Sequence, residues 1–343
     1  MDVFIDPRST INYSSFYVQG LYDYFGKSKV HFSSRYFREL EEIDMLMAFV
    51  LVKDGEIKKI IVDYRDQADI INAAFHWADT YAKINVNDST LSEKSDKLIN
   101  ITPSFAIKIW NPVELLFHVC INFFKAGIIR YRKSKNIHLR PKQWCRNYAS
   151  LLKRQTLESY TRKTNKPINN YVFFVSTFWK GQTNTNTYRN QYLLSCGKRE
   201  NINFEGGFFT GKQTDIPDSI PQRLRYTQWL SNRSYLENIK QSVFVFNTPA
   251  VHNCHGWKLG EFLCMGKAII STPLSNHLPF PLEHKQDILI VDNEEDIEDA
   301  ISTLLNDEEL RNRLEQNAKI YYEKYAKPFK VIEDITNHTF RSM

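Results

Sequence analysis

One stretch constrains the fold more than any other: residues 243–273, VFVFNTPAVHNCHGWKLGEFLCMGKAIISTP, place a helix between two apolar strands. The run from Ser242 to Phe246 favours a buried strand, and Thr248-Pro249 ends it. A helix is expected from about Trp257 until Gly266, followed by a strand over Ala268–Ser271. This order of elements predicts an α/β fold with a parallel sheet.

The turn before this helix carries donors that suit an anion: His252, His255, Gly256 and Lys258. In an open α/β sheet, the carboxyl ends of strands and the amino ends of helices form the ligand crevice, where free backbone N–H groups favour phosphate. Glu261, about one turn further on, is suited to accept hydrogen bonds from vicinal hydroxyls such as those of a ribose. The alternatives are histidines that bond buried backbone groups, and a solvated Lys258–Glu261 pair at i, i+3.

A length of 343 residues predicts two domains, and 42% hydrophobic with 24% charged residues excludes disorder on a large scale. The five cysteines show no metal-ligand spacing, which predicts free thiols in a reducing compartment and hence the cytoplasm. The amino terminus lacks the pattern of a secretory signal. No run reaches the roughly 18 apolar residues that a membrane span needs.

Charge is spread unevenly, because the basic residues between Lys125 and Lys166 are opposed only by Glu158. The apolar and aromatic segment Pro112–Ile129 precedes and overlaps this basic region. One interpretation is a helical pair that lies on an anionic membrane surface. The other is a core helix followed by a solvated basic helix. Nucleic acid is not expected as a partner, since no recognition motif accompanies the charge.

The first half alternates strands and helices. Strands are expected over Val3–Ile5, Val30–Phe32, Met47–Val52, Lys59–Val62 and Tyr81–Ile84, and helices over Phe16–Phe25 and Ala68–Ala78. A loop over Ser89–Asp96 and an extended stretch over Pro103–Ile109 follow. A basic helical segment over 112–164 completes an amino-terminal domain of residues 1–168.

The second half begins after a hinge expected over Asn165–Asn170. Tyr171–Ser176 is typical of a strand buried on both faces. Further strands are expected over Ile202–Glu205 and Asp287–Val291, and helices over Thr187–Cys196, Arg233–Lys240, Asp296–Leu305 and Glu308–Tyr325. This predicts a Rossmann-like domain over 169–326, while Pro328 redirects the tail, residues 327–343, back toward the first domain.

The ordered set SVFVF, GWKLGE, GKAIISTP and NDEELRNRLEQNAKIYYEKYAKP resembles the carboxy-terminal half of GT-B glycosyltransferases, especially the family 4-like (group 1) enzymes. The resemblance covers about residues 170–330 and includes the motif K-L-x-E-x-L-x-x-G-K-x-I-I-S-T-P. It implies two Rossmann-like domains that face a central cleft, with the donor, a nucleotide diphosphate sugar, bound by the second domain and the acceptor by the first.

The resemblance also assigns roles to residues. Glu261 would hold the donor ribose, and Lys258 would lie near the diphosphate or sugar. Lys180 and Arg189 are the nearest candidates for the basic pair that clamps the diphosphate. Asn253 stands where the family usually has an acidic residue that meets the donor sugar, which leaves the sugar and the stereochemical outcome open.

The chemistry of such a reaction explains why cations are expected. Breaking a glycosyl–phosphate bond leaves a nucleoside diphosphate whose negative charge grows in the transition state, so cations and helix N–H groups lower the barrier. The crevice contains no DxD motif, which predicts metal-independent chemistry with no cofactor beyond the donor substrate. Asp6, His76 and Asp79 are candidates for an acceptor-side base.

The expected function is therefore transfer of a hexose-like sugar to a glycan or lipid-linked glycan. The basic helices suggest bacterial surface polysaccharide synthesis by a peripheral enzyme at the inner face of the membrane. Two alternatives stay open: a sugar-nucleotide epimerase on the same frame, and a catalytically silent sugar-nucleotide-binding assembly protein.

Overall fold

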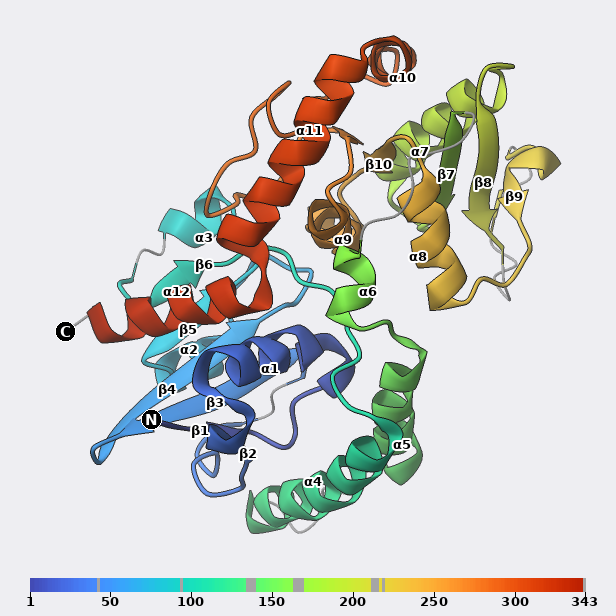
Figure 1. Ribbon diagram of the computed structural model, residues 1–343. Helices are drawn as coiled ribbons and strands as arrows, with labels where there is room; N and C mark the ends of the chain where they lie inside the picture. The colour runs from blue at the N-terminus through green and yellow to red at the C-terminus, as the bar shows by residue number, and fades with distance from the viewer. Residues whose placement is uncertain are drawn as a thin grey trace. The chain divides into compact units, whose positions relative to one another are not determined.

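The computed structural model describes residues 1–41, 44–92, 95–133, 140–162, 170–210, 216–217 and 220–341 (Figure 1). Of the expected hinge over Asn165–Asn170, only Asn170 falls within these ranges. The chain divides into two compact units. Unit 1 comprises Met1–Leu157, Asn276–Pro279 and Tyr325–Met343, and unit 2 comprises Glu158–Ser275 and Phe280–Lys324. Both units are mixed α/β structures, which confirms the predicted fold class.

Unit 1 is built on a six-stranded sheet in the order β2-β1-β3-β4-β5-β6. Its strands are β1 (Asp2–Ile5), β2 (Val30–Phe32), β3 (Leu46–Lys53), β4 (Glu56–Asp63), β5 (Thr80–Lys83) and β6 (Leu98–Asn100). Asp54 and Gly55 have positive φ angles and close the β3–β4 hairpin, so β3 is antiparallel to both neighbours. The other pairs are parallel, which places the carboxyl ends of β1, β4 and β5 at one edge.

The helices of unit 1 are α1 (Ile11–Phe25), α2 (Asn72–Trp77), α3 (Asp88–Ser92), α4 (Pro112–Lys133), α5 (Pro141–Ser150) and α12 (Pro328–Arg341), with short 3₁₀ turns at Lys27–Lys29 and Leu151–Lys153. Helix α12, drawn in red in Figure 1, packs against α1. A Cβ atom at Gly20 would lie 2.3 Å from the Pro328 carbonyl oxygen, so glycine is required for this close approach.

Three expectations for unit 1 were wrong in detail. Helix α2 begins at Asn72 rather than Ala68, because the Gln67 and Asp69 carbonyls accept hydrogen bonds from Lys83 and Arg65 side chains. The expected loop over Ser89–Asp96 starts inside helix α3, whose first turn is capped by the Asn87 side chain. The stretch Pro103–Ile109 joins no sheet; its buried N–H groups bond elsewhere, as Ile107 does to the Ser15 hydroxyl.

Unit 2 contains two three-stranded parallel sheets, β7-β8-β9 and β10-β11-β12. Their strands are β7 (Tyr171–Ser176), β8 (Asn203–Phe209), β9 (Arg225–Tyr226), β10 (Val245–Asn247), β11 (Ile269–Ser271) and β12 (Leu289–Ile290). The Val243 N–H donates to the Tyr171 carbonyl at 2.9 Å, so β10 runs beside β7. The combined order β9-β8-β7-β10-β11-β12 is the doubly wound order, and its switch point lies between β7 and β10.

The helices of unit 2 are α6 (Leu157–Thr161), α7 (Thr183–Gly197), α8 (Asn232–Gln241), α9 (Trp257–Met265), α10 (Asp296–Asn306) and α11 (Glu308–Tyr321), the last continued by a π-helical turn over Tyr322–Ala326. Further 3₁₀ turns cover Gln222–Leu224 and Val251–Asn253. Gly266 adopts a left-handed conformation with φ 64° and ends α9 where the sequence predicts. Helix α7 begins at Thr183, four residues earlier than expected, in a polar run of weak helix propensity.

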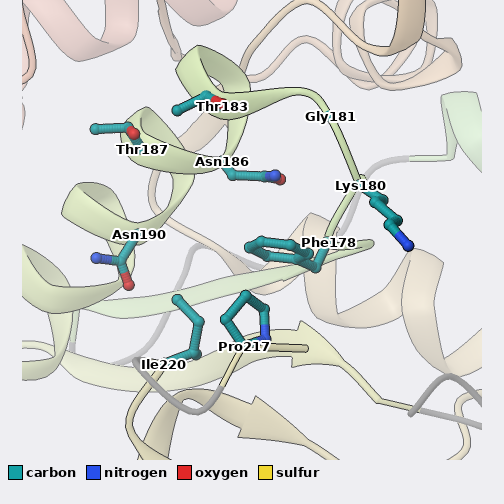
Figure 2. A pocket seen from close by; sticks show the side chains of 9 residues that line it. All are labelled: Phe178, Lys180, Gly181, Thr183, Asn186, Thr187, Asn190, Pro217 and Ile220. Carbon is teal, nitrogen blue, oxygen red and sulfur yellow. The ribbon is translucent and has the colours of Figure 1, made fainter. Parts of the chain in front are cut away.

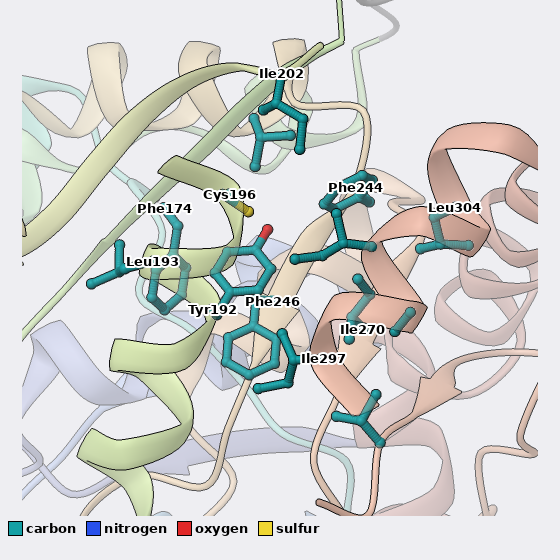
Figure 3. Close-up of a cluster of buried hydrophobic side chains, with 14 of the residues drawn as sticks. Phe174, Tyr192, Leu193, Cys196, Ile202, Phe244, Phe246, Ile270, Ile297 and Leu304 are labelled. Carbon is teal, nitrogen blue, oxygen red and sulfur yellow. The ribbon is translucent and has the colours of Figure 1, made fainter. Parts of the chain in front are cut away.

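The core of unit 2 joins its two sheets (Figure 3). Tyr192 of α7 stacks on Phe246 of β10 with ring centroids 4.3 Å apart, and Phe174 of β7 meets both rings edge-on. Gly206 lies within β8, and a Cβ atom there would be 2.2 Å from the Phe174 carbonyl oxygen, so glycine permits the close approach of β8 to β7. This packing fixes the carboxyl ends of β7 and β10 next to each other.

Candidate functional site

The candidate site lies in unit 2, at the switch point between β7 and β10. Arg189 from α7 is only 5% exposed and spans the ends of these strands. Its Nη1 donates to the Thr177 carbonyl at 2.8 Å, and its Nε donates to the Thr248 hydroxyl at 3.0 Å. Thr177 follows β7 and Thr248 follows β10, so the guanidinium lies where an open α/β sheet binds its ligand.

Lys258, in the first turn of α9, provides a second cation at the same place. Its Nζ donates to the Val175 carbonyl at 2.8 Å and lies 4.4 Å from the centre of the Phe174 ring. Desolvation and, to a smaller degree, the nearby charge of Arg189 together lower the pKa of Lys258 to about 7, against the opposing effect of Glu261. The residue as a whole is partly exposed.

Within the described ranges, both cations bond to uncharged groups, and no carboxylate forms an ion pair with Arg189 or Lys258. Desolvation also lowers the pKa of Arg189, to about 10, which still leaves it charged at neutral pH. A desolvated charge that hydrogen-bonds only to neutral groups costs free energy and attracts an anion. We call Arg189 and Lys258 the cation pair.

Helix α9 adds further groups beside the cation pair. Gly256 is its N-cap, His255 before it is buried, and the amino end of the helix carries the positive end of its dipole. Glu261 is 8% exposed, and its Oε1 accepts a hydrogen bond from the Tyr160 hydroxyl at 3.2 Å. The structure therefore gathers Arg189, His255, Gly256, Lys258 and Glu261 around one strand edge and one helix.

Two further predicted residues, His252 and Lys180, are exposed. His252 is exposed on the 3₁₀ turn Val251–Asn253, where it and Asn253 both have φ 57°. Lys180 is exposed and lines a cavity of about 510 Å³ beside the start of α7, together with Phe178, Gly181, Thr183, Asn186, Thr187, Asn190, Pro217 and Ile220 (Figure 2). Arg189 is not among the residues that line this cavity, and the pairing of Lys180 with Arg189 stays a prediction.

The three candidates for an acceptor-side base all lie in unit 1. Asp6 follows β1 and is buried at the carboxyl edge, where Arg8 donates to it from its backbone N–H, Nε and Nη2. Asp79 precedes β5 at the opposite edge, where its Oδ2 accepts from the Lys59 N–H at 2.7 Å. His76 is exposed on α2.

The sequence analysis missed a buried charged cluster at the carboxyl edge of unit 1. Asp63 ends β4 and Lys83 ends β5, and both side chains are fully buried. Lys83 Nζ, the Tyr81 hydroxyl and Arg65 Nη2 all donate to Asp63 Oδ2, at 2.8, 2.7 and 3.0 Å. Desolvation lowers the pKa of Lys83, while Asp63 acts in the opposite direction. The sequence signal for this cluster is a charged residue at the end of an apolar strand, as in IIVD.

No group of three or more His, Cys, Asp and Glu side chains within the described residues is placed to hold a metal ion. The metal requirement of any reaction stays a prediction.

Comparisons with known proteins gave structural likenesses only. No protein-family model matches the chain, and neither does any curated protein sequence. The structure is similar to HepE from Anabaena, solved in complex with UDP-glucose, with 13% identity and a TM-score of 0.46. The match covers 80% of this chain, and the chain spans 66% of the length of HepE.

Two further solved structures show likenesses of the same order. A glycosyltransferase from Rickettsia africae has 10% identity and a TM-score of 0.44, covering 79% of this chain and 68% of its own. A putative UDP-N-acetylglucosamine 2-epimerase from Listeria monocytogenes has 15% identity and a TM-score of 0.36, covering 79% and 77%.

Proposed function

We propose that this chain is a GT-B glycosyltransferase that transfers a hexose-like sugar from a nucleotide diphosphate donor to a glycan or lipid-linked glycan. The observation that carries the proposal is the cation pair. Arg189 and Lys258 stand at the switch point of a doubly wound unit, and their partners among the described residues are neutral groups. A pyrophosphate is the anion that this position binds in open α/β folds, and it would supply a counter-charge to the pair.

The proposed roles of the remaining groups follow from where negative charge develops during the reaction. As the glycosyl–phosphate bond breaks, negative charge grows on the departing nucleoside diphosphate, and the cation pair with the first-turn N–H groups of α9 stabilises it. Glu261 accepts hydrogen bonds from the ribose hydroxyls. Of the three candidates for an acceptor-side base, Asp6 lies at the carboxyl edge of its sheet, so we retain it as the catalytic candidate.

The finer features of the proposal concern location and chemistry. The chain acts in the cytoplasm, in peripheral contact with the anionic inner face of a membrane, where a lipid-linked acceptor for bacterial surface polysaccharide is available. The reaction proceeds without a metal ion or a cofactor beyond the donor. Asn253, on its exposed turn, leaves the stereochemical outcome to be measured.

A binding screen tests the proposal directly. Isothermal titration of the full chain with UDP, GDP, ADP and dTDP should give one nucleotide that binds at least about tenfold more tightly than inorganic pyrophosphate. Failure of all four nucleotides to bind would remove the proposed donor site. Incubation of the matching sugar nucleotide with and without an oligosaccharide acceptor then identifies the activity. A glycosylated product supports a transferase, an epimerised sugar without acceptor indicates an epimerase, and binding without turnover indicates a silent module.

Glu261→Gln tests the ribose contact within the same screen. The substitution preserves size and the bond from Tyr160, and it replaces one carboxylate oxygen by a donor. We expect nucleotide affinity to fall about tenfold while pyrophosphate affinity stays within about twofold, since a charge-assisted hydrogen bond contributes roughly 1.5–3 kcal/mol. The matched control is Glu237→Gln on α8, which changes an exposed carboxylate and should leave both affinities as in the wild type. An equal loss of affinity for both ligands in Glu261→Gln would place Glu261 near the diphosphate instead.

A further inference from the structure

Helix α4 presents an apolar face to solvent. Between Pro112 and Ile129, the exposed residues are Val113, Leu116, Phe117, Cys120, Phe124 and Ile128. At about 100° per residue, these positions fall within one arc of about 120°, centred opposite the buried Asn122. The charged residues of this stretch, Glu114 and Lys125, are partly exposed and bond to Lys27 and to the Phe32 carbonyl. We call this arc the α4 apolar face.

The opposite side of α4 is fixed within unit 1. Leu115, Asn122, Ala126 and Ile129 are buried, and Lys125 Nζ donates to the Phe32 carbonyl at 2.8 Å. Helix α5 adds two bonds, because Asn122 Nδ2 donates to the Tyr148 hydroxyl at 3.1 Å and Trp144 Nε1 donates to the Val119 carbonyl at 3.1 Å. The helix therefore holds its apolar face outward.

No uninterrupted apolar run reaches the length of a membrane span, as the sequence indicates, but α4 is a candidate by length and mean hydropathy. The window Pro112–Ile129 has a mean hydropathy of 1.4, which makes α4 long and apolar enough to cross a bilayer by length and composition, and 22% of the window is buried. A crossing helix would lose its bonds to Phe32 and Tyr148. A helix that keeps these bonds can contact a membrane only by lying along its surface.

The surrounding charge identifies the kind of surface. Residues 115–157 contain ten Lys and Arg residues and no Asp or Glu. On α5, the basic residues Lys142 and Arg146 are exposed on the side opposite the buried Tyr148. Anionic headgroups attract such residues by about 1 kcal/mol each near the surface. A second copy docked on the α4 apolar face would bring a second copy of this basic segment close to the first.

We propose that the α4 apolar face docks on an anionic lipid bilayer, with α4 parallel to the surface and Lys142 and Arg146 against the headgroups. The inference rests on the proposed function for its purpose, which is to bring the chain to a lipid-linked acceptor. It does not depend on donor binding, so each proposal can fail without the other.

Vesicle co-sedimentation of the full chain tests this docking. The wild type should bind vesicles of equimolar phosphatidylcholine and phosphatidylglycerol, and bind phosphatidylcholine alone at least about tenfold more weakly. The triple variant Leu116→Gln/Phe117→Gln/Phe124→Gln replaces side chains that are 64%, 60% and 70% exposed, so folding is expected to survive. It should bind anionic vesicles at least about tenfold more weakly. The double variant Lys142→Gln/Arg146→Gln should bind anionic vesicles about thirtyfold more weakly.

Matched controls use exposed residues elsewhere. Ile320→Gln changes an apolar residue that is 52% exposed on α11, and Lys198→Gln removes an exposed lysine after α7. Both should bind vesicles like the wild type. Circular dichroism and the nucleotide titration show whether each variant is folded and still binds donor, which separates loss of docking from loss of the proposed function.

An environment-sensitive fluorophore on Cys120 reports which surface touches lipid. Cys120 is exposed within the α4 apolar face, and the other exposed thiol is removed by Cys145→Ser. Emission should shift to the blue with anionic vesicles, whereas a label at Lys198→Cys in a Cys120→Ser/Cys145→Ser background should not respond. The proposal is overturned if the wild type ignores anionic vesicles, if the triple variant binds as well as the wild type, or if the chain forms dimers that the triple variant abolishes.

Discussion

Buried charged side chains have different partners at the carboxyl strand ends of the two units. In unit 1, the Lys83 and Arg65 side chains share the Asp63 carboxylate, and Asp6 pairs with Arg8. In unit 2, Arg189 and Lys258 bond to a threonine hydroxyl and two backbone carbonyls. The first edge pairs its charges within the protein. The second carries positive charge that an anionic ligand can neutralise, which is why we place the donor there.

Position within unit 2 matters as well as charge. Lys267 is also buried there, and it donates to the Lys240 and Ser242 carbonyls at the end of α8. Desolvation lowers the pKa of Lys267 to about 8. A cation at a helix carboxyl terminus stabilises the helix dipole, so this lysine has a structural role. It lies before β11, at the edge opposite the cation pair.

The largest expected effect comes from breaking the charge pairing in unit 1. Asp63→Asn leaves Lys83 buried without its counter-charge and weakens the bonds from Tyr81 and Arg65. We expect the free energy of unfolding to fall by about 3–5 kcal/mol, measured by urea denaturation. Asp69→Asn is the control, because Asp69 pairs with Arg65 while 65% exposed, and it should cost less than about 1 kcal/mol. A similar small loss for Asp63→Asn would mean that the two edges do not differ.

Lys258→Met should weaken ligand binding with little loss of stability, in contrast to Asp63→Asn. Removing a desolvated cation whose described partner is a backbone carbonyl should lower the free energy of unfolding by no more than about 1 kcal/mol, or raise it. Nucleotide and pyrophosphate affinities should both fall by roughly tenfold to a hundredfold, because a charge-assisted contact to the diphosphate is lost. Calorimetry and urea denaturation measure the two quantities.

Lys267→Met is the matched control for that variant. It should destabilise the fold through the loss of its bonds to the end of α8 and leave nucleotide affinity unchanged. If Lys258→Met destabilised the protein while binding stayed normal, Lys258 would belong with Lys267 as a structural lysine.

The smallest expected effect is a pH dependence of donor binding. The pKa of Lys258 is lowered to about 7, so the free protein loses this charge as pH rises through that value. An anion favours the protonated amine, so donor affinity should be highest below this pKa and fall above it by up to about tenfold per pH unit. Titration of the sugar nucleotide between about pH 6 and 8.5 measures the slope. Lys258→Met should bind weakly and with a flatter profile; identical profiles would exclude Lys258 as the titrating group.

Some of the candidate site could be predicted from the sequence because it is local. Lys258 and Glu261 belong to one helix, whose start at Gly256 and end at Gly266 are visible in the sequence pattern. The placement of Arg189 was not accessible in this way. It lies far along the chain from Thr248, and only the fold brings its guanidinium to that hydroxyl.

The charged cluster of unit 1 shows the same limit. Asp63 and Lys83 lie on different strands, and only the parallel register of β4 and β5 makes them direct partners. The element boundaries that were wrong, such as the start of α2, depend on hydrogen bonds from Arg65 and Lys83 that come from outside the helix.

The sequence by itself determined the α/β class and the order of most elements, because apolar periodicity and glycine positions act over a few neighbouring residues. The tertiary structure decided which charges meet a partner. Lys83 ends a strand and bonds to the Asp63 carboxylate. Lys258 lies in the first turn of a helix and bonds to a backbone carbonyl. Coulomb interactions and desolvation depend on distances in space, and those distances are set only when the sheets assemble.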